Sequence, residues 1–218
     1  MAKSSDVLMP LFYQHNINAS TKIGVWHITE DEGFFLQKVT LQKNITHWHK
    51  RLQHLAGRYL LPYLFPGFPH QLILIADTRK PYLPGEEFHF SISHCGDFAA
   101  VMVSKHQRVG VDIELVSSKV GLISHKFLND DELPKPSLGA CQQNTPDLQK
   151  LTLLWCCKEA VFKWYGNGGV DFKNHIHLGH RRGEKTPGVI TSFFLKDEPV
   201  ALDIHYKLFD GMCLAWVA

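Results

Sequence analysis

Two short segments contain residues whose types and spacing could do chemistry: 110–114 (GVDIE) and 155–163 (WCCKEAVFK). Side chains on a strand alternate between faces, so Asp112 and Glu114 would point the same way while Ile113 points into the core. Side chains four positions apart on a helix share a face, so the glutamate and the second lysine of the other segment would lie together. Local structure could therefore direct these carboxylates and lysines at one point.

The helical segment adds Glu159 and Lys163 to this set, and Lys158 is their neighbour in the sequence. Asp112, Glu114 and Glu159 would supply the oxygen ligands of a hard divalent cation, usually Mg²⁺, with substrate phosphates completing the shell. The two segments therefore predict a metal-dependent enzyme that acts on a phosphate ester.

Length and charge permit this prediction without requiring it. A chain of 218 residues can form one large domain or two small ones, and either can bury an adequate core. The 23 basic and 21 acidic residues leave a net charge of +2, which gives no general field for nucleic acid or a membrane. Any basic site must therefore be local.

The cysteines and the first residues favour the cytoplasm. The five cysteines form no CxxC pair, and adjacent Cys156 and Cys157 do not suit one disulfide framework. Residues 1–14 contain one lysine and a short apolar stretch broken by Pro10, too little for a secretion signal. No later apolar run is long enough to cross a bilayer.

The first half of the chain predicts elements that would position these residues. Residues 48–59 have helical spacing of apolar side chains, and Pro62 marks the expected end. Apolar runs at 99–104 and 109–114 suggest a hairpin that would place the two strand carboxylates at the end of its second strand. Further strands are predicted at 23–28, 72–76 and 88–93.

The second half predicts one long helix and a meander of strands. We expect a helix from Thr145-Pro146-Asp147 to about Tyr165, ended by the glycines of 166–169. A short helix near 125–131 and a surface loop would precede it. Strands are predicted at 189–195, 200–206 and 212–217.

A cationic row of Arg51, His54 and Arg58 lies along the helix at 48–59. It would suit a phosphate or a carboxylate, although a solvated face of an ordinary amphipathic helix has the same pattern.

The order of these pieces resembles the 4′-phosphopantetheinyl transferase family, and within it the larger Sfp-like class. The family pattern has a Gly-Lys-Pro loop, a strand ending in Ser-His, then Gly-x-Asp-x-Glu, then Trp-x-x-Lys-Glu-Ala or Ser followed by a lysine. Here these are 79–81 (RKP), 91–94 (SISH), 110–114 and 155–163. Arg79 stands in place of the glycine, and Ser91 and Cys95 stand where many members have asparagine and serine. The resemblance covers about residues 80–169.

The resemblance implies transfer of the phosphopantetheine arm of coenzyme A to a serine of an apo acyl or peptidyl carrier protein, which releases 3′,5′-ADP, as in a holo-[acyl-carrier-protein] synthase. Asp112, Glu114 and Glu159 would hold Mg²⁺ against the pyrophosphate. Glu159, directly or through a metal-bound water, would be the general base. Lys163 would offset charge on the leaving phosphate, with Lys158 contributing from the same helix.

The resemblance also implies how coenzyme A is held. Ser93 and His94 would contact the nucleotide phosphates, and Lys80 would approach the adenine or its 3′-phosphate. Arg51 is the expected partner of the 3′-phosphate, with Arg58 or Lys43 as alternatives.

The implied fold is α+β, with two similar halves related by a pseudo-twofold axis that meet at a cleft for coenzyme A. The expected halves are 1–105 and 106–218, and the second would carry most of the metal site. One chain would then supply the whole site, so a monomer is expected. Candidate docking surfaces for an acidic carrier helix are the loop at 115–145 and the rim at 164–169.

Other functions remain open from the residues. A Mg²⁺-dependent phosphohydrolase could use the same carboxylates, and a non-catalytic nucleotide or coenzyme A binding module could use the basic residues. His175, His177 and His180 could suggest zinc, but only the first two would share a strand face. The carrier and its pathway, the choice of Mg²⁺ or Mn²⁺ and the tolerance of acyl-coenzyme A stay undetermined.

Overall fold

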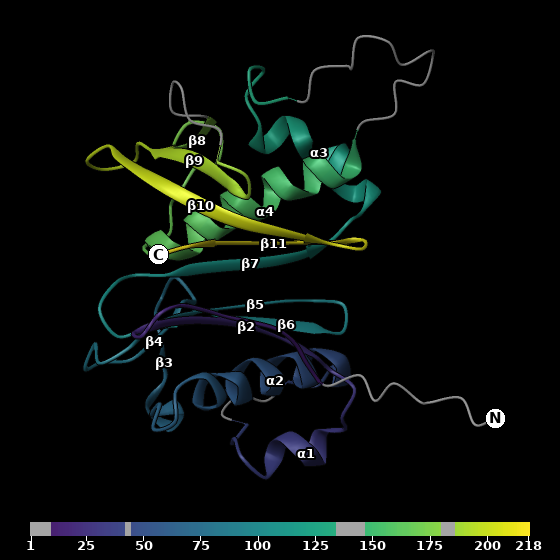
Figure 1. Ribbon diagram of the computed structural model, residues 1–218, viewed down its shortest axis with the longest axis vertical. Helices are drawn as coiled ribbons and strands as arrows, with labels where there is room; N and C mark the ends of the chain where they lie inside the picture. The colour runs from purple at the N-terminus through teal and green to yellow at the C-terminus, as the bar shows by residue number, and fades with distance from the viewer. Residues whose placement is uncertain (1–9, 42–44, 134–146, 180–185) are drawn as a thin grey trace, which may run out of the picture.

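Two antiparallel sheets form the centre of the molecule (Figure 1). The computed structural model describes residues 10–41, 45–133, 147–179 and 186–218. The first sheet has the order β1-β2-β6-β5 and the second β7-β11-β10-β9-β8. The strands of the first are β1 (Leu11–Asn18), β2 (Thr21–His27), β5 (His89–Cys95) and β6 (Phe98–Ser104). Those of the second are β7 (Gly110–Leu115), β8 (Ile176–Gly179), β9 (Val189–Phe194), β10 (Val200–Phe209) and β11 (Met212–Val217).

A long helix covers the outer face of each sheet. In Figure 1 the two sheets lie face to face, with α2 (Trp48–Leu64) outside the first and α4 (Leu148–Tyr165) outside the second. The shorter elements are α1 (Glu32–Leu36), the 3₁₀ turn η1 (His70–Leu72), α3 (Ser118–Phe127) and the paired strands β3 (Leu74–Ile75) and β4 (Pro81–Tyr82). No helix in the described part of the chain combines the length and apolar character that a membrane span requires.

The core has three main layers that follow from this arrangement. Buried Leu55 and Leu60 of α2 pack on one face of the first sheet. Cys156 and Val161 of α4 pack on one face of the second. Residues of both sheets, with Val109 from the segment that joins them, fill the layer between the sheets: Ile23, Val25, Ala100, Met102, Val111, Ile113, Met212, Leu214 and Trp216. Apolar burial on this scale is the main favourable contribution to folding.

Several predicted elements are confirmed with adjusted ends. The strands predicted at 23–28, 88–93, 189–195, 200–206 and 212–217 are present as β2, β5, β9, β10 and β11. The strand predicted at 72–76 shrinks to two residues. The helix predicted near 125–131 begins earlier, at Ser118, because the Ser117 side chain caps its first turn.

The hairpin predicted from 99–104 and 109–114 is wrong. β6 pairs with β2 and β5 in the first sheet, whereas β7 pairs with β11 in the second. The true hairpin is β5–β6, which turns at Gly96 with φ 53°. Residues 105–109 instead carry the chain from one sheet to the other, so sequence adjacency of two apolar runs did not indicate pairing.

Two helix ends also differ from prediction. α2 continues past Pro62 to Leu64. Pro62 has no N–H to donate a helical hydrogen bond, and the burial of Leu61 and Leu64 offsets this loss. α4 begins at Leu148, where the Asp147 side chain accepts a bond from the Lys150 amide. Thr145 and Pro146, predicted as its start, lie outside the described residues.

Candidate functional site

The site begins with the close approach of α4 to β7 at Gly110. A Cβ atom at this position would lie 2.0 Å from the Ala160 carbonyl oxygen and 2.6 Å from the Trp164 nitrogen. Only glycine therefore allows the helix to lie so near the strand. This contact brings Glu159 and Lys163 of α4 over the carboxylates of β7.

Side chains of β5 hold β7 on its other edge. The Ser91 hydroxyl accepts a hydrogen bond from the Val111 amide at 3.1 Å, and the Ser93 hydroxyl accepts one from the Ile113 amide at 3.4 Å. Cys95 Sγ accepts from the Leu115 amide at 3.3 Å. Every second residue of β5 therefore satisfies an edge amide of β7 and fixes where its carboxylates lie. We call these three side chains the β5 ladder.

Asp112 is the centre of the polar cluster. Its Oδ1 atom accepts the Ser93 hydroxyl at 2.7 Å and the Lys163 Nζ at 2.5 Å, and Lys163 also donates to Ser93 Oγ at 2.8 Å. Asp112 is only 2 % exposed, and within the described chain its Oδ2 atom is buried without a hydrogen-bond partner. The predicted Asp112, Ser93 and Lys163 thus come together at one place.

Glu114 and Glu159 complete the acidic side of the cluster. Glu114 accepts from Cys95 Sγ at 3.3 Å and from the Trp155 indole nitrogen at 3.2 Å. Burial and the charge of Asp112 raise the pKa of Glu114. The same two causes raise the pKa of Glu159 to about 7, with Glu114 adding to the effect. The hydrogen bond from the Trp155 indole to Glu114 was not predicted, because the direction of an indole ring depends on tertiary packing.

Lys163 compensates part of this negative charge. Burial lowers its pKa, but the Asp112 and Glu159 carboxylates outweigh burial, so the pKa of Lys163 is raised above its ordinary value. One ammonium group therefore faces three carboxylates, and the net field at the cluster is negative.

These residues fit a divalent cation by their chemistry. The orphaned Asp112 oxygen and the mutual elevation of the Glu114 and Glu159 pKa values both indicate a missing positive charge. As placed, no three histidine, cysteine or acidic side chains of the described residues are grouped closely enough to hold an ion. The Lys163 ammonium occupies one oxygen of Asp112, so a bound ion would require the side chains to rearrange.

Two pockets lead away from the cluster. The near pocket, of about 420 Å³, is lined by Arg79, Lys80 and Lys163 among others. The far pocket, of about 830 Å³, is lined by His54, Arg58, Arg79 and His94 together with Ile45, Ile75, Pro81 and Ile92. No aspartate or glutamate lines either pocket in the part of the chain that the structure describes. The pair therefore forms a cationic cleft beside an acidic cluster.

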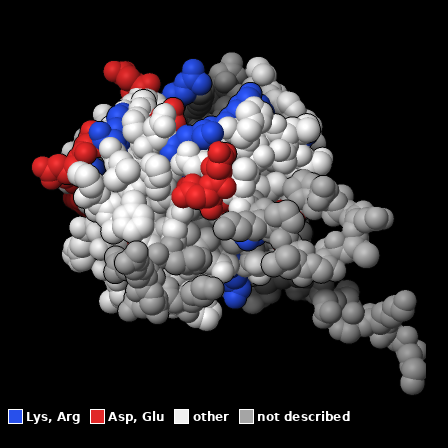
Figure 2. All heavy atoms as spheres, turned by 90° about the horizontal axis from the view of Figure 1, so that it is seen from above, with Lys and Arg blue, Asp and Glu red and all other residues white. Residues whose placement is uncertain are grey.

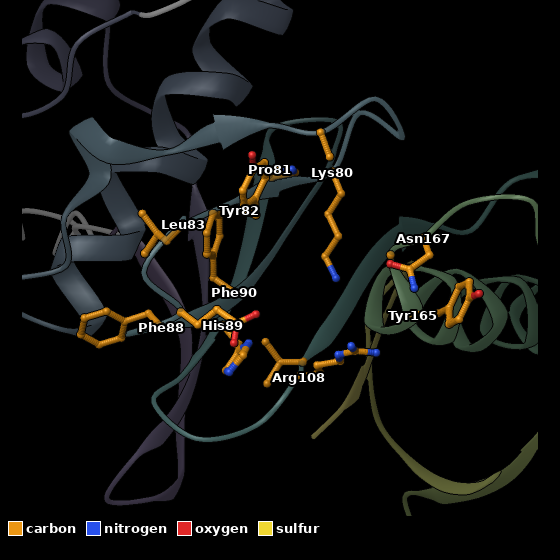
Figure 3. Close-up of a pocket in the computed structure, with 14 residues that line it drawn as sticks. Lys80, Pro81, Tyr82, Leu83, Phe88, His89, Phe90, Arg108, Tyr165 and Asn167 are labelled. Carbon is orange, nitrogen blue, oxygen red and sulfur yellow. The ribbon is translucent and has the colours of Figure 1, made fainter. Parts of the chain in front are cut away.

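The Lys80 side chain extends from the loop before β4 toward the start of β7 and the end of α4 (Figure 3). It lies near Arg108 on one side and Asn167 on the other, in a smaller pocket of about 270 Å³. Burial and the nearby Arg108 lower the pKa of Lys80 to about 8. Lys80 also lines the near pocket, beside Arg79.

Two predicted residues are not brought to the cluster. Lys158 is fully buried and donates to Glu132 Oε2 at 2.7 Å and to the Phe172 and Ile176 carbonyls. Arg51 pairs with Glu32 at 2.6 Å and donates to the Ile45 carbonyl, and it lines neither pocket of the cleft.

Arg58 instead lies in the far pocket and is only 6 % exposed. Its Nη1 atom contacts His54 Nδ1 at 3.1 Å, and its Nε atom is buried without a partner among the described residues. Sequence spacing identified both arginines of α2 and could not rank them, because burial depends on tertiary packing. Lys43, the third alternative, lies outside the described residues.

The sequence is similar to those of known proteins. The sequence model of the 4′-phosphopantetheinyl transferase superfamily matches residues 108–216. The chain is 31 % identical to enterobactin synthase component D of Salmonella austin over 118 residues, which are 54 % of this chain and 49 % of that protein. It is 37 % identical to the protein of the same name from Escherichia coli (strain K12), over 52 % of this chain and 54 % of that protein.

A third relative is 4′-phosphopantetheinyl transferase AcpT of Escherichia coli O157:H7, 29 % identical over 59 % of this chain and 68 % of that protein. The chain spans about half the length of the first two relatives. The matched residues 108–216 contain β7 and α4, and with them Asp112, Glu114, Glu159 and Lys163. With half of its length matched by the family, the chain belongs to the 4′-phosphopantetheinyl transferase superfamily.

Proposed function

We propose that this protein transfers the 4′-phosphopantetheine group of coenzyme A to a serine of an apo acyl or peptidyl carrier protein. The observation that carries the proposal is an acidic cluster whose lysine, Lys163, also lines a cationic cleft. Among the described residues, no aspartate or glutamate lines this cleft. Such a cleft suits a polyphosphate ligand, and the cluster suits the pyrophosphate at which transfer occurs.

The proposed reaction balances as a phosphoryl transfer. The serine oxygen of the carrier forms a bond to the phosphorus that bears pantetheine, and the bond from this phosphorus to the 3′,5′-ADP leaving group breaks. Glu159, directly or through a metal-bound water, accepts the serine proton. Lys163 offsets the charge that develops on the leaving phosphate.

Asp112, Glu114 and Glu159 would hold Mg²⁺ in this proposal. The ion would supply neutralisation of the pyrophosphate charge and would orient the reacting oxygen. Ser93 supports this arrangement by bonding both Asp112 and Lys163.

The cleft supports a position for coenzyme A. We assign Lys80 and Lys163 of the near pocket to the phosphates next to the cluster, and His94 and Arg58 of the far pocket to the 3′-phosphate. Arg58 replaces Arg51 in this role because it is the buried guanidinium that lacks an acidic partner. Lys158 then has a structural role in the second half of the chain.

The proposal extends to the architecture and the setting of the reaction. We propose that the sheet-and-helix units are the two halves at 1–105 and 106–218, related by a pseudo-twofold axis, in a monomer. Exposed Leu115, Leu122 and Leu133 support the stretch around α3 as the surface for the carrier protein. The four described cysteines are free, which supports a reducing cytoplasm.

The test is a transfer assay with coenzyme A, Mg²⁺ and several purified apo carrier proteins, read by the mass of the carrier. We expect a gain of one phosphopantetheinyl group with the wild type and none with Asp112→Asn. The matched control is Asp210→Asn, in the exposed β10–β11 turn, which keeps full activity. Release of product without any carrier gain would favour a phosphohydrolase, and coenzyme A binding without turnover would favour a binding module.

A further inference from the structure

Cys95 of the β5 ladder makes two hydrogen bonds to β7. Its sulfur accepts the Leu115 amide and its thiol donates to Glu114 Oε2, both at 3.3 Å. Ser93 makes the same pair of bonds two residues earlier, to the Asp112 carboxylate and to the amide that follows it. Each of these two side chains therefore links β5 to one carboxylate of the acidic cluster.

Glu114 has a donor on each of its carboxylate oxygens. Oε2 accepts the Cys95 thiol, and Oε1 accepts the Trp155 indole nitrogen at 3.2 Å. The Trp155 ring is held by aromatic packing, because its centroid lies 4.9 Å from that of Phe127 and 5.5 Å from that of Phe172. A donor on each oxygen fixes the plane of the carboxylate, and an oxygen with one hydrogen bond keeps a lone pair for a cation.

The Cys95 thiol is suited to donate a hydrogen bond. Burial raises the pKa of Cys95 to about 11, and the charge of Glu114 adds to the rise. The sulfur therefore keeps its proton at neutral pH. An ionised carboxylate can only accept, so the hydrogen bond runs from the thiol to Glu114.

Two positions of the ladder separate support of a carboxylate from support of the strand. The bond from the Leu115 amide to Cys95 lies at an exposed position, so water can replace the sulfur as acceptor. Ser91 accepts the buried Val111 amide, and it has no carboxylate partner in the part of the chain that the structure describes. Loss of the thiol should thus act on Glu114, and loss of the Ser91 hydroxyl should act on the strand.

We propose that Cys95 is a positioning residue whose thiol orients the Glu114 carboxylate to bind the divalent cation. The task of that cation rests on the proposed function, whereas the orientation of Glu114 rests on its own hydrogen bonds. Cys95 acts through Glu114 and is not itself a ligand of the cation. A hydroxyl can take its place, because Ser93 makes the equivalent bonds to Asp112 and to its following amide.

The test compares cation binding by the wild type, Cys95→Ala, Cys95→Ser and Ser91→Ala. Mn²⁺ replaces Mg²⁺, and the electron paramagnetic resonance signal of the free ion gives its Kd with and without coenzyme A. We expect Cys95→Ala to weaken Mn²⁺ binding about 10-fold, a modest loss for a residue that orients a metal ligand, because a thiol is a weak donor. Cys95→Ser should stay within about 3-fold of the wild type, because the hydroxyl restores the donor.

Ser91→Ala is the matched control, because it removes a bond of the same ladder and no carboxylate contact. Its melting temperature should fall, since a buried amide loses its acceptor, while its Kd for Mn²⁺ stays within about 3-fold of the wild type. Cys95→Ala should show a smaller change in melting temperature and the larger change in Kd. In the transfer assay, Cys95→Ala should raise the KM for Mg²⁺ about 10-fold and leave the KM for coenzyme A within about 2-fold.

Three results would overturn the role of Cys95. They are an unchanged Kd for Mn²⁺ in Cys95→Ala, weak binding that Cys95→Ser does not restore, and an equal loss of binding in Ser91→Ala. Failure of the proposed function alone gives a different result, in which the wild type modifies no carrier but the Kd values follow the expected order. A wild type that binds no Mn²⁺ would contradict both proposals.

Discussion

The ionised form of Glu159 destabilises the folded protein. Its pKa lies at about 7 in the folded protein because burial and the charges of Asp112 and Glu114 oppose ionisation. The folded state therefore binds this proton more tightly than the unfolded state. The stabilisation of the folded state by the protonated carboxyl is complete below pH 4.5, the pKa of Glu159 in the unfolded chain. It is lost as the pH rises through about 7, the pKa in the folded protein.

The first prediction follows from this sign. In metal-free protein at pH 8, Glu159→Gln should raise the free energy of unfolding, by at most about 3 kcal/mol, because it removes a disfavoured charge. The gain should vanish near pH 4.5. Denaturation in urea across this pH range measures it, and Mg²⁺ should stabilise the wild type more than the variant. Transfer activity should fall at least about 100-fold.

A Glu159→Gln protein that is less stable than the wild type at pH 8 would contradict this picture. It would show that the carboxylate is stabilised by its surroundings, and the cluster would then not require a cation.

Lys158 carries the second prediction. The Lys158 and Glu132 side chains are 0 % and 2 % exposed, and Glu132 also accepts the Leu178 amide. Lys158→Ala would leave a buried carboxylate without its partner, so the free energy of unfolding should fall by about 3 to 5 kcal/mol. Lys150→Ala, at an exposed position of the same helix, should change it by less than about 0.5 kcal/mol.

Urea denaturation measures both variants. A second variant, Lys158→Met combined with Glu132→Gln, should recover part of the loss because no charge then remains buried. Wild-type stability in Lys158→Ala would show that the lysine does not hold the helix, and its proposed structural role would be lost.

The residues of the cluster were predictable because they depend on local period alone. Asp112 and Glu114 share a strand face and Glu159 and Lys163 share a helix face, whatever the fold around them. The direction of Lys158 was not predictable in this way. Neighbours on a helix point about 100° apart, and only the packing of Glu132 under α4 decides that Lys158 is internal.

At the level of elements, β7 is the edge strand of its sheet, and the β5 ladder accepts the amide hydrogen bonds that a neighbouring strand would otherwise accept. Ser91 is 4 % exposed and accepts the Val111 amide. The third prediction is that Ser91→Ala lowers the free energy of unfolding by about 1 to 3 kcal/mol, because a buried amide then lacks a partner. Hydrogen exchange of the Val111 amide should become faster than in the wild type, and this readout locates the effect.

Ser192→Ala is the matched control in the other sheet. Ser192 is fully buried, but its hydroxyl has no partner among the described residues, so its removal should be neutral or stabilising. Equal losses in the two variants would mean that burial of a serine, and not the ladder bond, determines the effect.

Gly110 gives the fourth prediction at this scale. In Gly110→Ala the new Cβ atom would meet the backbone of α4, so the helix must move away from β7. We expect a loss of about 1 to 3 kcal/mol in unfolding free energy and a drop in transfer, because Glu159 and Lys163 move with the helix. Gly85→Ala, whose nearest neighbour would be a Glu87 side-chain atom at 3.8 Å, should change neither.

Measurement of kcat and KM separates displacement from simple instability. A stable Gly110→Ala protein with unchanged kcat would show that the close contact does not position Glu159 and Lys163 for the proposed reaction.

The elements themselves were predictable where period and end signals agreed. Strands β9, β10 and β11 alternate or are bounded by turns, and Gly166 ends α4 in the left-handed conformation that such a glycine predicts. The predicted pairing of β6 with β7 was wrong because an apolar run in a sequence does not indicate which strand it pairs with. β6 is buried along nearly its whole length between β2 and β5, which leaves no edge for β7.

At the scale of the whole molecule, charge does not organise the fold. Figure 2 shows basic and acidic side chains intermixed on the face seen from above, with no broad area of one sign. This distribution agrees with the net charge of +2. The cationic cleft is thus a local feature, as the composition required, and the sheet interface is what joins its two sides.

That interface carries the last prediction. Met102 of β6 is fully buried in the layer between the sheets, where it packs with residues of β7 and β11. Met102→Ala should lower the free energy of unfolding by about 2 to 5 kcal/mol, because the cavity is shared by both sheets. Leu122→Ala, at a position 76 % exposed, should change it by less than about 0.5 kcal/mol.

The decisive observation is whether both sheets respond together. Hydrogen exchange of amides in β2 and in β11 should show the same loss of protection in Met102→Ala, since the layer between them belongs to one cooperative unit. Loss of protection confined to β2 would show that the sheets unfold independently. The cleft, whose lining comes from both parts of the chain, would then be lost by separation of the sheets before either unfolds, and nucleotide binding would fail at lower denaturant than unfolding of β11.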